Sequence, residues 1–203
     1  GALIIDTTTS EAETSKAEAN AAQAQGVAFL DAPVSGGPAG ARAGTMTMVI
    51  GGEEAALDAA RPLLTDLAAK IVHVGPSGAG NIAKIANNLL CAANLVLVSE
   101  MVQLAKRAGV APEDLLEGIN AGSGRSGVSE VNFPRWILSE AFDSGFTMGL
   151  MRKDVGLAQA LADEQDAPAP ATRQIAALWE ASRSTLPDSA DFNEIFRFEA
   201  PND

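Results

Sequence analysis

The chain has 203 residues, and its 26 acidic and 14 basic side chains give a formal net charge of −12. This length suits one large or two small domains with a buried core. The acidic surface argues against nucleic acid and anionic membranes as partners. No uninterrupted apolar run reaches the roughly 18 residues of a membrane span, and no signal segment is expected at the start.

Cysteine and histidine are too scarce for several classes of site. The single cysteine, Cys91, excludes an internal disulfide, and its apolar surroundings favour a buried, inert thiol. The single histidine, His73, argues against a histidine-rich metal site and a Ser-His-Asp triad, and a packing role in a strand is expected. We therefore predict no metal site and a cytoplasmic, reducing location.

The first thirty residues predict a strand, a helix and a second strand. Residues 2–5 are apolar, and Ser10 with Glu13 forms a capping-box pattern before an alanine-rich helix. Gly26 ends this helix, and residues 27–30 are again apolar. Elements in this order predict a βαβ unit with parallel strands.

A loop rich in glycine and proline occupies residues 31–40 and leads into a short helical turn over residues 38–43. A strand over 45–50, an amphipathic helix over 53–69 and a strand over 70–74 are predicted next. Because open α/β sheets bind ligands at the carboxyl ends of their strands, the glycine-rich loop is a candidate binding site.

After Pro76 the pattern changes from strands to helices. A helix is predicted from Ser77 or Gly78 to Arg107, about 30 residues or roughly 45 Å long at 1.5 Å per residue. Shorter helices are expected in five further segments, which are residues 112–120, 131–138, 150–164, 171–184 and 192–198. The predicted fold class is α/β followed by all-α, with the long helix joining the two parts.

A lysine and an asparagine lie near the start of the long helix. Lys84 and Asn88 are four residues apart, so they share one helical face, and an apolar run over residues 89–98 follows them. Lysine is rarely buried without a partner or a task. Desolvation can lower the pKa of such a lysine into a range useful for proton transfer. The alternative is a lysine that extends to solvent and an asparagine that caps a neighbouring loop.

The glycine-rich loop contains a second candidate feature, Ser35 followed by Gly36 and Gly37. It presents unobstructed backbone N–H groups and a hydroxyl, which suit a carboxylate ligand. A plain tight turn is the alternative for paired glycines. A carboxylate cradle together with the Lys84 and Asn88 pair would suit a small hydroxy acid.

Three motifs occur in a fixed order along the chain. They are Asp-Ala-Pro-Val-Ser-Gly-Gly at residues 31–37, Gly78-x-Gly80-x3-Lys84-x2-Asn87-Asn88, and Phe146 with Lys-Asp-Val-Gly-Leu-Ala at residues 153–158. In this order they resemble the β-hydroxyacid dehydrogenase family. Within the family the resemblance is strongest to the branch of 3-hydroxyisobutyrate dehydrogenase and its near relatives, and residues 120–126 also resemble the glycine-serine-arginine loop of that branch. The resemblance extends over essentially the whole chain.

The resemblance implies a role for each matching position. Lys84 resembles the catalytic lysine, which relays a proton to or from the substrate hydroxyl as hydride moves. Substrate-binding roles fall on five positions, which are Ser35, Gly36, Gly37, Asn88 and Arg125. Cofactor-binding roles fall on three positions, which are Thr9, Phe146 and Lys153. NAD or NADP is the implied cofactor, and a homo-oligomer through the helical part is the implied assembly.

One family feature has no counterpart in the sequence. The family opens with a strand, a G-x-G-x-x-G turn and a helix that hold the pyrophosphate, and this chain has no such fingerprint. The resemblance therefore implies that residues 1–77 are the last part of a Rossmann-type dinucleotide-binding domain and residues 78–203 a helical domain. The chain as given would then bind NAD(P) poorly or not at all. The choice between NAD and NADP stays open, because the discriminating residue follows a strand that is absent here.

The predicted function is an NAD(P)-dependent oxidoreductase that interconverts a small 3-hydroxy acid and its semialdehyde. A tartronate semialdehyde (2-hydroxy-3-oxopropionate) reductase, or another short aldehyde-acid reductase of the family, is the alternative, although Arg125 and its loop favour the first. A non-catalytic reader or assembly module would be expected to lack the lysine, and Lys84 is present. A small carboxylate-bearing substrate is the expected partner, without nucleic acid or membrane.

Overall fold

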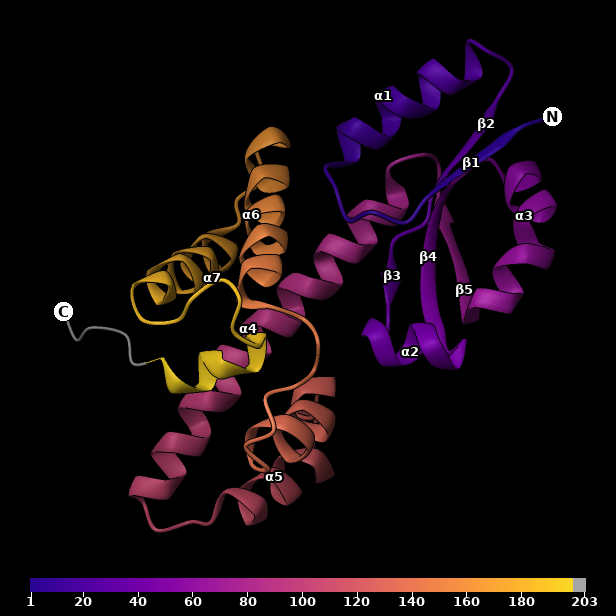
Figure 1. Ribbon diagram of the computed structural model, residues 1–203. Coiled ribbons are helices and arrows are strands. Elements are labelled where there is room, and N and C mark those ends of the chain that lie inside the picture. The colour runs from indigo at the N-terminus through magenta and orange to yellow at the C-terminus, as the bar shows by residue number, and fades with distance from the viewer. Residues whose placement is uncertain (199–203) are drawn as a thin grey trace. The chain divides into compact units, whose positions relative to one another are not determined.

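A computed structural model describes residues 1–198, and its chain divides into two compact units (Figure 1). The first unit comprises Gly1–Asn87 with Asp163–Gln165, and the second comprises Asn88–Ala162 with the chain from Asp166 onward. The first unit is α/β and the second is helical, which confirms the predicted fold class. The division falls within the long helix α4 (Ala79–Arg107), ten residues after the boundary expected from the motifs, because the first turns of α4 pack on the sheet of the first unit.

A five-stranded mixed sheet forms the centre of the first unit. Its strands are β1 (Leu3–Asp6), β2 (Ala28–Asp31), β3 (Val34–Ser35), β4 (Met46–Gly52) and β5 (Ala68–Gly75). β1 pairs with β2 in parallel, which confirms the βαβ unit. β4 runs antiparallel to β2 and β3 and parallel to β5. The short β3 was expected to be loop, but Val34 and Ser35 pair with Met48 and Thr47.

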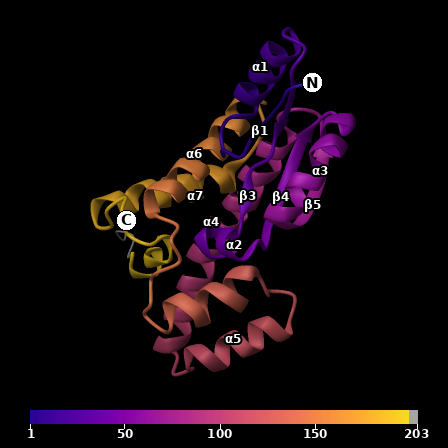
Figure 2. The same cartoon turned by 45° about the vertical axis from the view of Figure 1, so that its right-hand side comes forward.

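Three helices accompany this sheet. They are α1 (Ala12–Gln23), α2 (Gly37–Ala43) and α3 (Glu54–Leu67), and α1 lies beside β1 and β2 whereas α3 lies beside β5 (Figures 1 and 2). Met48 and Ile50 are alternate residues of β4, so both point to one face of the sheet, where they join Leu57 and Leu64 of α3 in a buried core. Sheet strands and helix residues therefore share one apolar layer, which holds the carboxyl end of β2 in place.

The expected capping box at the start of α1 is wrong. The residue that precedes the first turn is Glu11, and its side chain makes no capping hydrogen bond. The Ser10 hydroxyl instead accepts a hydrogen bond from the side-chain amide of Asn81, which is 71 residues away in the sequence. A long-range partner has replaced the local one that the sequence pattern suggested.

The second unit is built around α4 and the helices that follow it. These are α5 (Pro112–Ala121), the π-helix η1 (Val128–Ile137), α6 (Met148–Glu164), α7 (Pro170–Ala181) and the 3-10 turns η2 (Ser182–Ser184) and η3 (Phe192–Arg197). In both views α6 and α7 lie side by side (Figures 1 and 2). Ala92, Leu95 and Val102 of α4 are fully buried in the core of this unit, and the Trp179 indole donates a hydrogen bond to the Ala92 carbonyl.

By length and average composition, α4 could cross a membrane, although none of its uninterrupted apolar runs is long enough. In its most apolar window, 44% of the residues are buried inside the protein. Core helices pass the same test, and the buried face of α4 supplies the core of the second unit, so this is weak evidence for a membrane span.

The single histidine and the single cysteine both have structural roles. His73 lies in β5, as expected, and its Nε2 atom is 2.7 Å from the Gly52 carbonyl oxygen. Cys91 is partly buried and packs against the core of the second unit. Within residues 1–198, no group of three His, Cys, Asp or Glu side chains could hold a metal ion.

A buried arginine links three segments of the second unit. Arg152 of α6 donates to the carbonyl oxygens of Trp179 and Leu186, to the Ser182 hydroxyl and to the Asp188 carboxylate. Its side chain is only 2% exposed, whereas that of Asp188 is 54% exposed. The guanidinium therefore satisfies the three buried acceptors on Trp179, Ser182 and Leu186, which water could not easily reach.

This network predicts an acid-sensitive contribution to stability. The hydrogen bond from Arg152, with the positive charges of Arg183 and Arg152, holds the pKa of the Asp188 carboxyl below its ordinary value. A lowered pKa in the folded state stabilises the fold above the ordinary pKa, and this contribution is lost as the pH falls through the lowered value. We therefore expect stability to fall below about pH 4. Asp188→Asn should lose part of this dependence in thermal melts across pH, and parallel curves for both proteins would contradict the prediction.

Candidate functional site

Lys84 and Ser35 meet in the first unit. Lys84 lies on α4 and is only 7% exposed, although lysine is among the least often buried residues. Its Nζ donates a hydrogen bond of 2.8 Å to the Ser35 hydroxyl at the end of β3. The structure thus places the predicted catalytic lysine against the predicted carboxylate loop, across 49 positions of sequence.

A buried carboxylate fixes the start of the helix that carries Lys84. Asp31, at the carboxyl end of β2, is fully buried and accepts hydrogen bonds from the backbone N–H groups of Gly78 (2.8 Å) and Asn81 (3.0 Å). The first N–H groups of a helix have no partner within the helix, and a negative charge there is favourable. Asp31 therefore anchors α4 to the sheet, a role that its place in the first motif did not indicate.

The glycines around this anchor allow the helix to approach the sheet. A Cβ on Gly80 would lie 2.5 Å from the Asp31 carbonyl oxygen, and one on Gly51 would lie 2.5 Å from its carboxylate. Real Cβ atoms do not approach so closely, so a larger residue at position 80 would push α4 away from the sheet, and one at position 51 would displace the Asp31 carboxylate. Gly80 of the second motif therefore serves helix–sheet packing in this structure.

The glycines after Ser35 are required by the backbone. Gly36 has a φ of 127° and Gly37 a φ of 59°, values that L-residues with a side chain rarely adopt. A Cβ on Gly36 would also lie 3.4 Å from the Met46 Cα atom. The tight-turn interpretation of these glycines therefore holds, and both remain exposed beside Ser35. A carboxylate-binding role is compatible with this geometry.

In the second unit, one buried carboxylate contacts two of the predicted site residues. Asp154 is 2% exposed, and its Oδ2 accepts a hydrogen bond of 2.5 Å from the Asn88 side-chain amide. The Lys153 Nζ lies 2.9 Å from its Oδ1. Asp154 belongs to the third motif, but the sequence by itself assigns it no role. Its spacing of three residues from Met151 and four from Ala158, both apolar and buried on α6, was the signal that it faces inward.

The remaining predicted site residues occupy three other segments of the chain. Thr9 is partly buried in the loop after β1, and Arg125 is exposed in the loop between α5 and η1. The Phe146 ring packs edge-on against Phe192 with 5.3 Å between ring centroids, next to the core of the second unit. Its ring therefore contributes to packing, and a cofactor contact through Phe146 remains a prediction.

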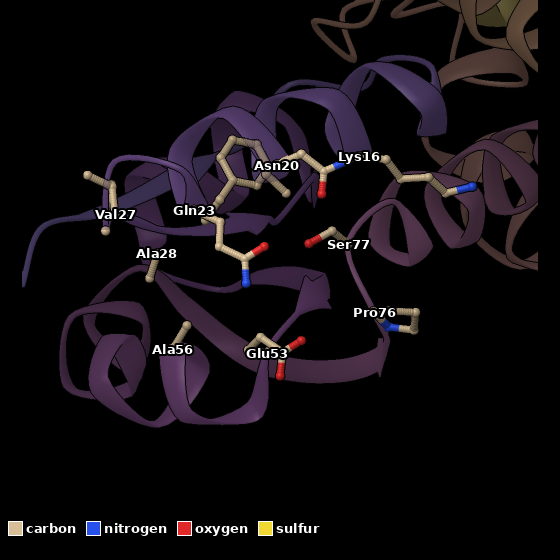
Figure 3. Close-up of a pocket in the computed structure, with 12 residues that line it drawn as sticks. Lys16, Asn20, Gln23, Val27, Ala28, Glu53, Ala56, Pro76 and Ser77 are labelled. Atoms are coloured by element: carbon tan, nitrogen blue, oxygen red, sulfur yellow. The ribbon is translucent and has the colours of Figure 1, made fainter.

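A cavity of about 630 Å³ also opens on the first unit (Figure 3). Side chains from α1, β2 and the segments before α3 and α4 surround it, including Asn20, Gln23, Glu53 and Ser77. Its lining includes neither Ser35 nor Lys84. The cavity is therefore separate from the contact that brings together the predicted catalytic residues.

Two known families match the chain in succession. Residues 1–75 match the NAD binding domain of 6-phosphogluconate dehydrogenase. Residues 78–198 match the family described as NAD-binding of NADP-dependent 3-hydroxyisobutyrate dehydrogenase. Together the two matches cover almost all of the described residues.

Individual relatives agree with this assignment. The 2-(hydroxymethyl)glutarate dehydrogenase of Eubacterium barkeri is 37% identical over 97% of this chain and 65% of its own length. The NAD-dependent L-serine dehydrogenase of Pseudomonas aeruginosa is 38% identical over 84% of this chain and 59% of its own length, so the chain spans less than two thirds of either relative. The structure of Mycobacterium tuberculosis 3-hydroxyisobutyrate dehydrogenase with L-serine matches with a TM-score of 0.89 and 32% identity, over 96% of this chain and 69% of that one. The chain therefore belongs to the β-hydroxyacid dehydrogenase family, as its three ordered motifs predicted.

Proposed function

We propose that the whole protein is an NAD(P)-dependent oxidoreductase that interconverts a small 3-hydroxy acid and its semialdehyde, with Lys84 transferring the proton. The observation that carries this proposal is the buried Lys84, whose Nζ donates to Ser35 beside a loop of exposed glycines. A buried amine next to a hydroxyl and open backbone N–H groups suits a substrate with both a hydroxyl and a carboxylate. The family membership supports the same chemistry.

Each group has a separate task in this proposal. Bound NAD(P) supplies the hydride acceptor or donor. The Lys84 amine takes the hydroxyl proton during oxidation and returns it during reduction, so the proton and the hydride leave by different routes. Ser35, Gly36 and Gly37 hold the substrate carboxylate, while Asn88 and Arg125 bind the rest of the substrate. Asp154 keeps the Asn88 amide in one orientation, because its carboxylate can only accept from the amide NH₂.

The cofactor would be contacted by only a few residues of this chain. Thr9 follows β1 at the carboxyl end of that strand, where open α/β sheets bind ligands, so it fits a contact with the nicotinamide. Lys153 is 45% exposed, which leaves its side chain accessible to a ligand in addition to its ion pair with Asp154. The G-x-G-x-x-G spacing at residues 122–127 follows the helix α5 and not a strand, so no pyrophosphate contact is assigned to this chain.

L-Serine is a second candidate substrate. One relative is an L-serine dehydrogenase, and the similar Mycobacterium tuberculosis structure is described with L-serine. L-Serine is itself a 3-hydroxy acid, and it differs from 3-hydroxyisobutyrate by an ammonium group in place of a methyl group. A pocket that leaves a charged ammonium unpaired would discriminate strongly against serine.

A turnover assay on the whole protein tests the proposed function. NAD⁺ and NADP⁺ are each supplied with 3-hydroxyisobutyrate, L-serine, 2-(hydroxymethyl)glutarate and a 2-hydroxy acid of similar size. Tartronate semialdehyde is tested in reduction with NADH and NADPH. We expect kcat/KM for one 3-hydroxy acid to exceed that for a 2-hydroxy acid of similar size by about tenfold or more. The proposal is wrong if none of the hydroxy acids is oxidised with either cofactor, and a preference for tartronate semialdehyde would favour the alternative reductase.

We also propose that the whole protein is a homo-oligomer that assembles through the helical unit. Leu90, Leu97, Met101 and Leu104 are exposed on α4, and their spacing of three, four and seven residues places them on one helical face. A row of exposed large apolar side chains is typical of a protein–protein interface.

Disrupting this row should dissociate the oligomer. Leu97→Glu places a charge in the middle of the apolar face, so we expect it to shift the protein to monomer at micromolar concentration. Gln103→Glu is the matched control, because Gln103 is also exposed but lies on another side of α4. Size-exclusion chromatography with light scattering gives the masses. A wild-type monomer, or an equal effect of both variants, would refute this assembly.

A further inference from the structure

Asn81 of α4 is fully buried, and its side-chain amide makes three hydrogen bonds within the first unit. Its Oδ1 accepts from the Ser10 backbone N–H (3.0 Å), and its Nδ2 donates to the hydroxyls of Ser10 (3.3 Å) and Ser15 (2.9 Å). A backbone N–H can only donate, so the amide oxygen must face Ser10 and the amide nitrogen must face the two hydroxyls. The orientation of the amide is thereby determined by its partners.

The partners of Asn81 belong to two different segments. Ser10 ends the loop that follows β1 and is the neighbour of Thr9, whereas Ser15 is a fully buried residue of α1. The other end of the loop is held by β1 itself, because the Thr8 N–H donates to the Asp6 carboxylate (3.0 Å). The loop over residues 7–10 is therefore secured at both ends, and Asn81 provides the attachment to α4.

The same helix carries Lys84 one turn further on. Asn81 precedes Lys84 by three residues, and its own backbone N–H donates to the buried Asp31 carboxylate. The position of α4 along the sheet is thus determined by Asp31, and the position of the loop relative to α4 by Asn81. Any movement of Asn81 would change the placement of Thr9 relative to Lys84.

We infer that Asn81 is a positioning residue that holds the loop over residues 7–10 against α4, and so keeps Thr9 in place for the cofactor. This inference rests on the proposed NAD(P)-dependent function, and it assigns a role to a residue that none of the motif matches singled out. A buried amide with satisfied hydrogen bonds also stabilises a fold in any protein. The tests must therefore separate cofactor binding from stability.

The comparison of Asn81→Ala with Ser15→Ala in the whole protein separates these two roles. Asn81→Ala releases the loop, and Ser15→Ala removes a buried partner of Asn81 but leaves both contacts with Ser10. We expect Asn81→Ala to raise the Kd for NADH or NADPH by about tenfold or more, because a small displacement of a contacting group has a large effect. Turnover at saturating cofactor should change less than this Kd. Ser15→Ala should change the Kd by no more than about twofold.

Ser10→Ala provides a milder variant in case Asn81→Ala does not fold. It removes one hydroxyl contact but keeps the N–H bond to Asn81, so we expect the Kd for the cofactor to rise by about threefold. The inference fails if Asn81→Ala lowers the melting temperature without weakening cofactor binding. It also fails if Ser15→Ala weakens binding as much as Asn81→Ala, or if Ser10→Ala leaves the Kd unchanged when it is the only variant that folds.

Hydrogen exchange distinguishes this inference from the proposed function. The amide of Ser10 should exchange faster in Asn81→Ala than in the wild type, and should stay protected in Ser15→Ala. If the wild type binds cofactor but oxidises no hydroxy acid, these exchange and Kd effects would still support the role of Asn81 while the proposed substrate class fails. If turnover is observed but the Ser10 amide exchanges at the same rate in all variants, the positioning role fails alone.

Discussion

Replacement of Lys84 by alanine should lower kcat of the whole protein by about 10²-fold or more, because general acid–base groups contribute rate factors of this size. Lys84 is buried, and its Nζ donates a hydrogen bond to the Ser35 hydroxyl of the predicted substrate loop. Lys84→Arg should not restore turnover, because a guanidinium stays protonated at all accessible pH values and cannot take up a proton. Cofactor Kd and the circular dichroism spectrum should change little in either variant.

A second lysine of the first unit serves as the control for Lys84. Lys16 is about half exposed and forms an ion pair with Glu13, so Lys16→Ala should leave kcat within about twofold. Ser35→Ala should raise the KM for the hydroxy acid and lower kcat less than Lys84→Ala, since it removes a partner of the amine and leaves the amine itself. A Lys84→Ala protein with near-normal turnover would end the assignment of Lys84 as the proton-transfer group.

The second large effect concerns stability. We expect Arg152→Ala to destabilise the second unit by about 3–5 kcal/mol, the range seen when one partner of a buried charged network is removed. The substitution leaves the buried carbonyl oxygens of Trp179 and Leu186 and the Ser182 hydroxyl without their donor. Hydrogen exchange by mass spectrometry over α6 and α7 can measure this loss even if the rest of the protein unfolds separately.

Arg183→Ala is a matched control for Arg152→Ala, because both guanidinium groups bond the Asp188 carboxylate. Arg183 is 48% exposed, and exposed ion pairs contribute about 0–1 kcal/mol. Arg152→Ala should therefore raise the hydrogen-exchange rates of the backbone amides in α6 and α7 several-fold more than Arg183→Ala does. Similar protection in both proteins would mean that Arg152 contributes no more than a surface ion pair does.

Local signals were sufficient to predict most of the helices and strands. The long apolar run after Lys84, with Gly78 before it and Gly109 after it, predicted the start of α4 to within two residues and its end at Arg107. The capping box at Ser10 failed because a capping pattern records only local partners, whereas the Ser10 hydroxyl is used by Asn81 in α4. The two-residue strand β3 was not predicted, because so short a strand has no pattern of its own in the sequence and is defined only by its pairing with β4.

The candidate site shows the same division between local and long-range information. Lys84 and Ser35 were predicted from chemistry and from motif order, and the structure joins them by a hydrogen bond. The residues that hold the predicted ones in place, Asp31, Asn81 and Asp154, were not predicted. Each of them has a hydrogen-bond partner 47 to 71 positions away in the sequence. The sequence alone does not show whether a buried polar residue will have such a partner in the folded chain.

The sequence by itself therefore determined the α/β-then-helical plan and the family, and it singled out Lys84 as the candidate proton-transfer residue, because these depend on periodicity, on turn residues and on residue types in a fixed order. Only the tertiary structure decided how α4 is held against the sheet and which polar side chains are buried. Positions 51 and 80 require glycine because a Cβ at either position would collide with Asp31, and this requirement is visible only in the folded structure. Close packing and the pairing of buried polar groups are properties of segments distant in sequence, so they appear only once the chain has folded.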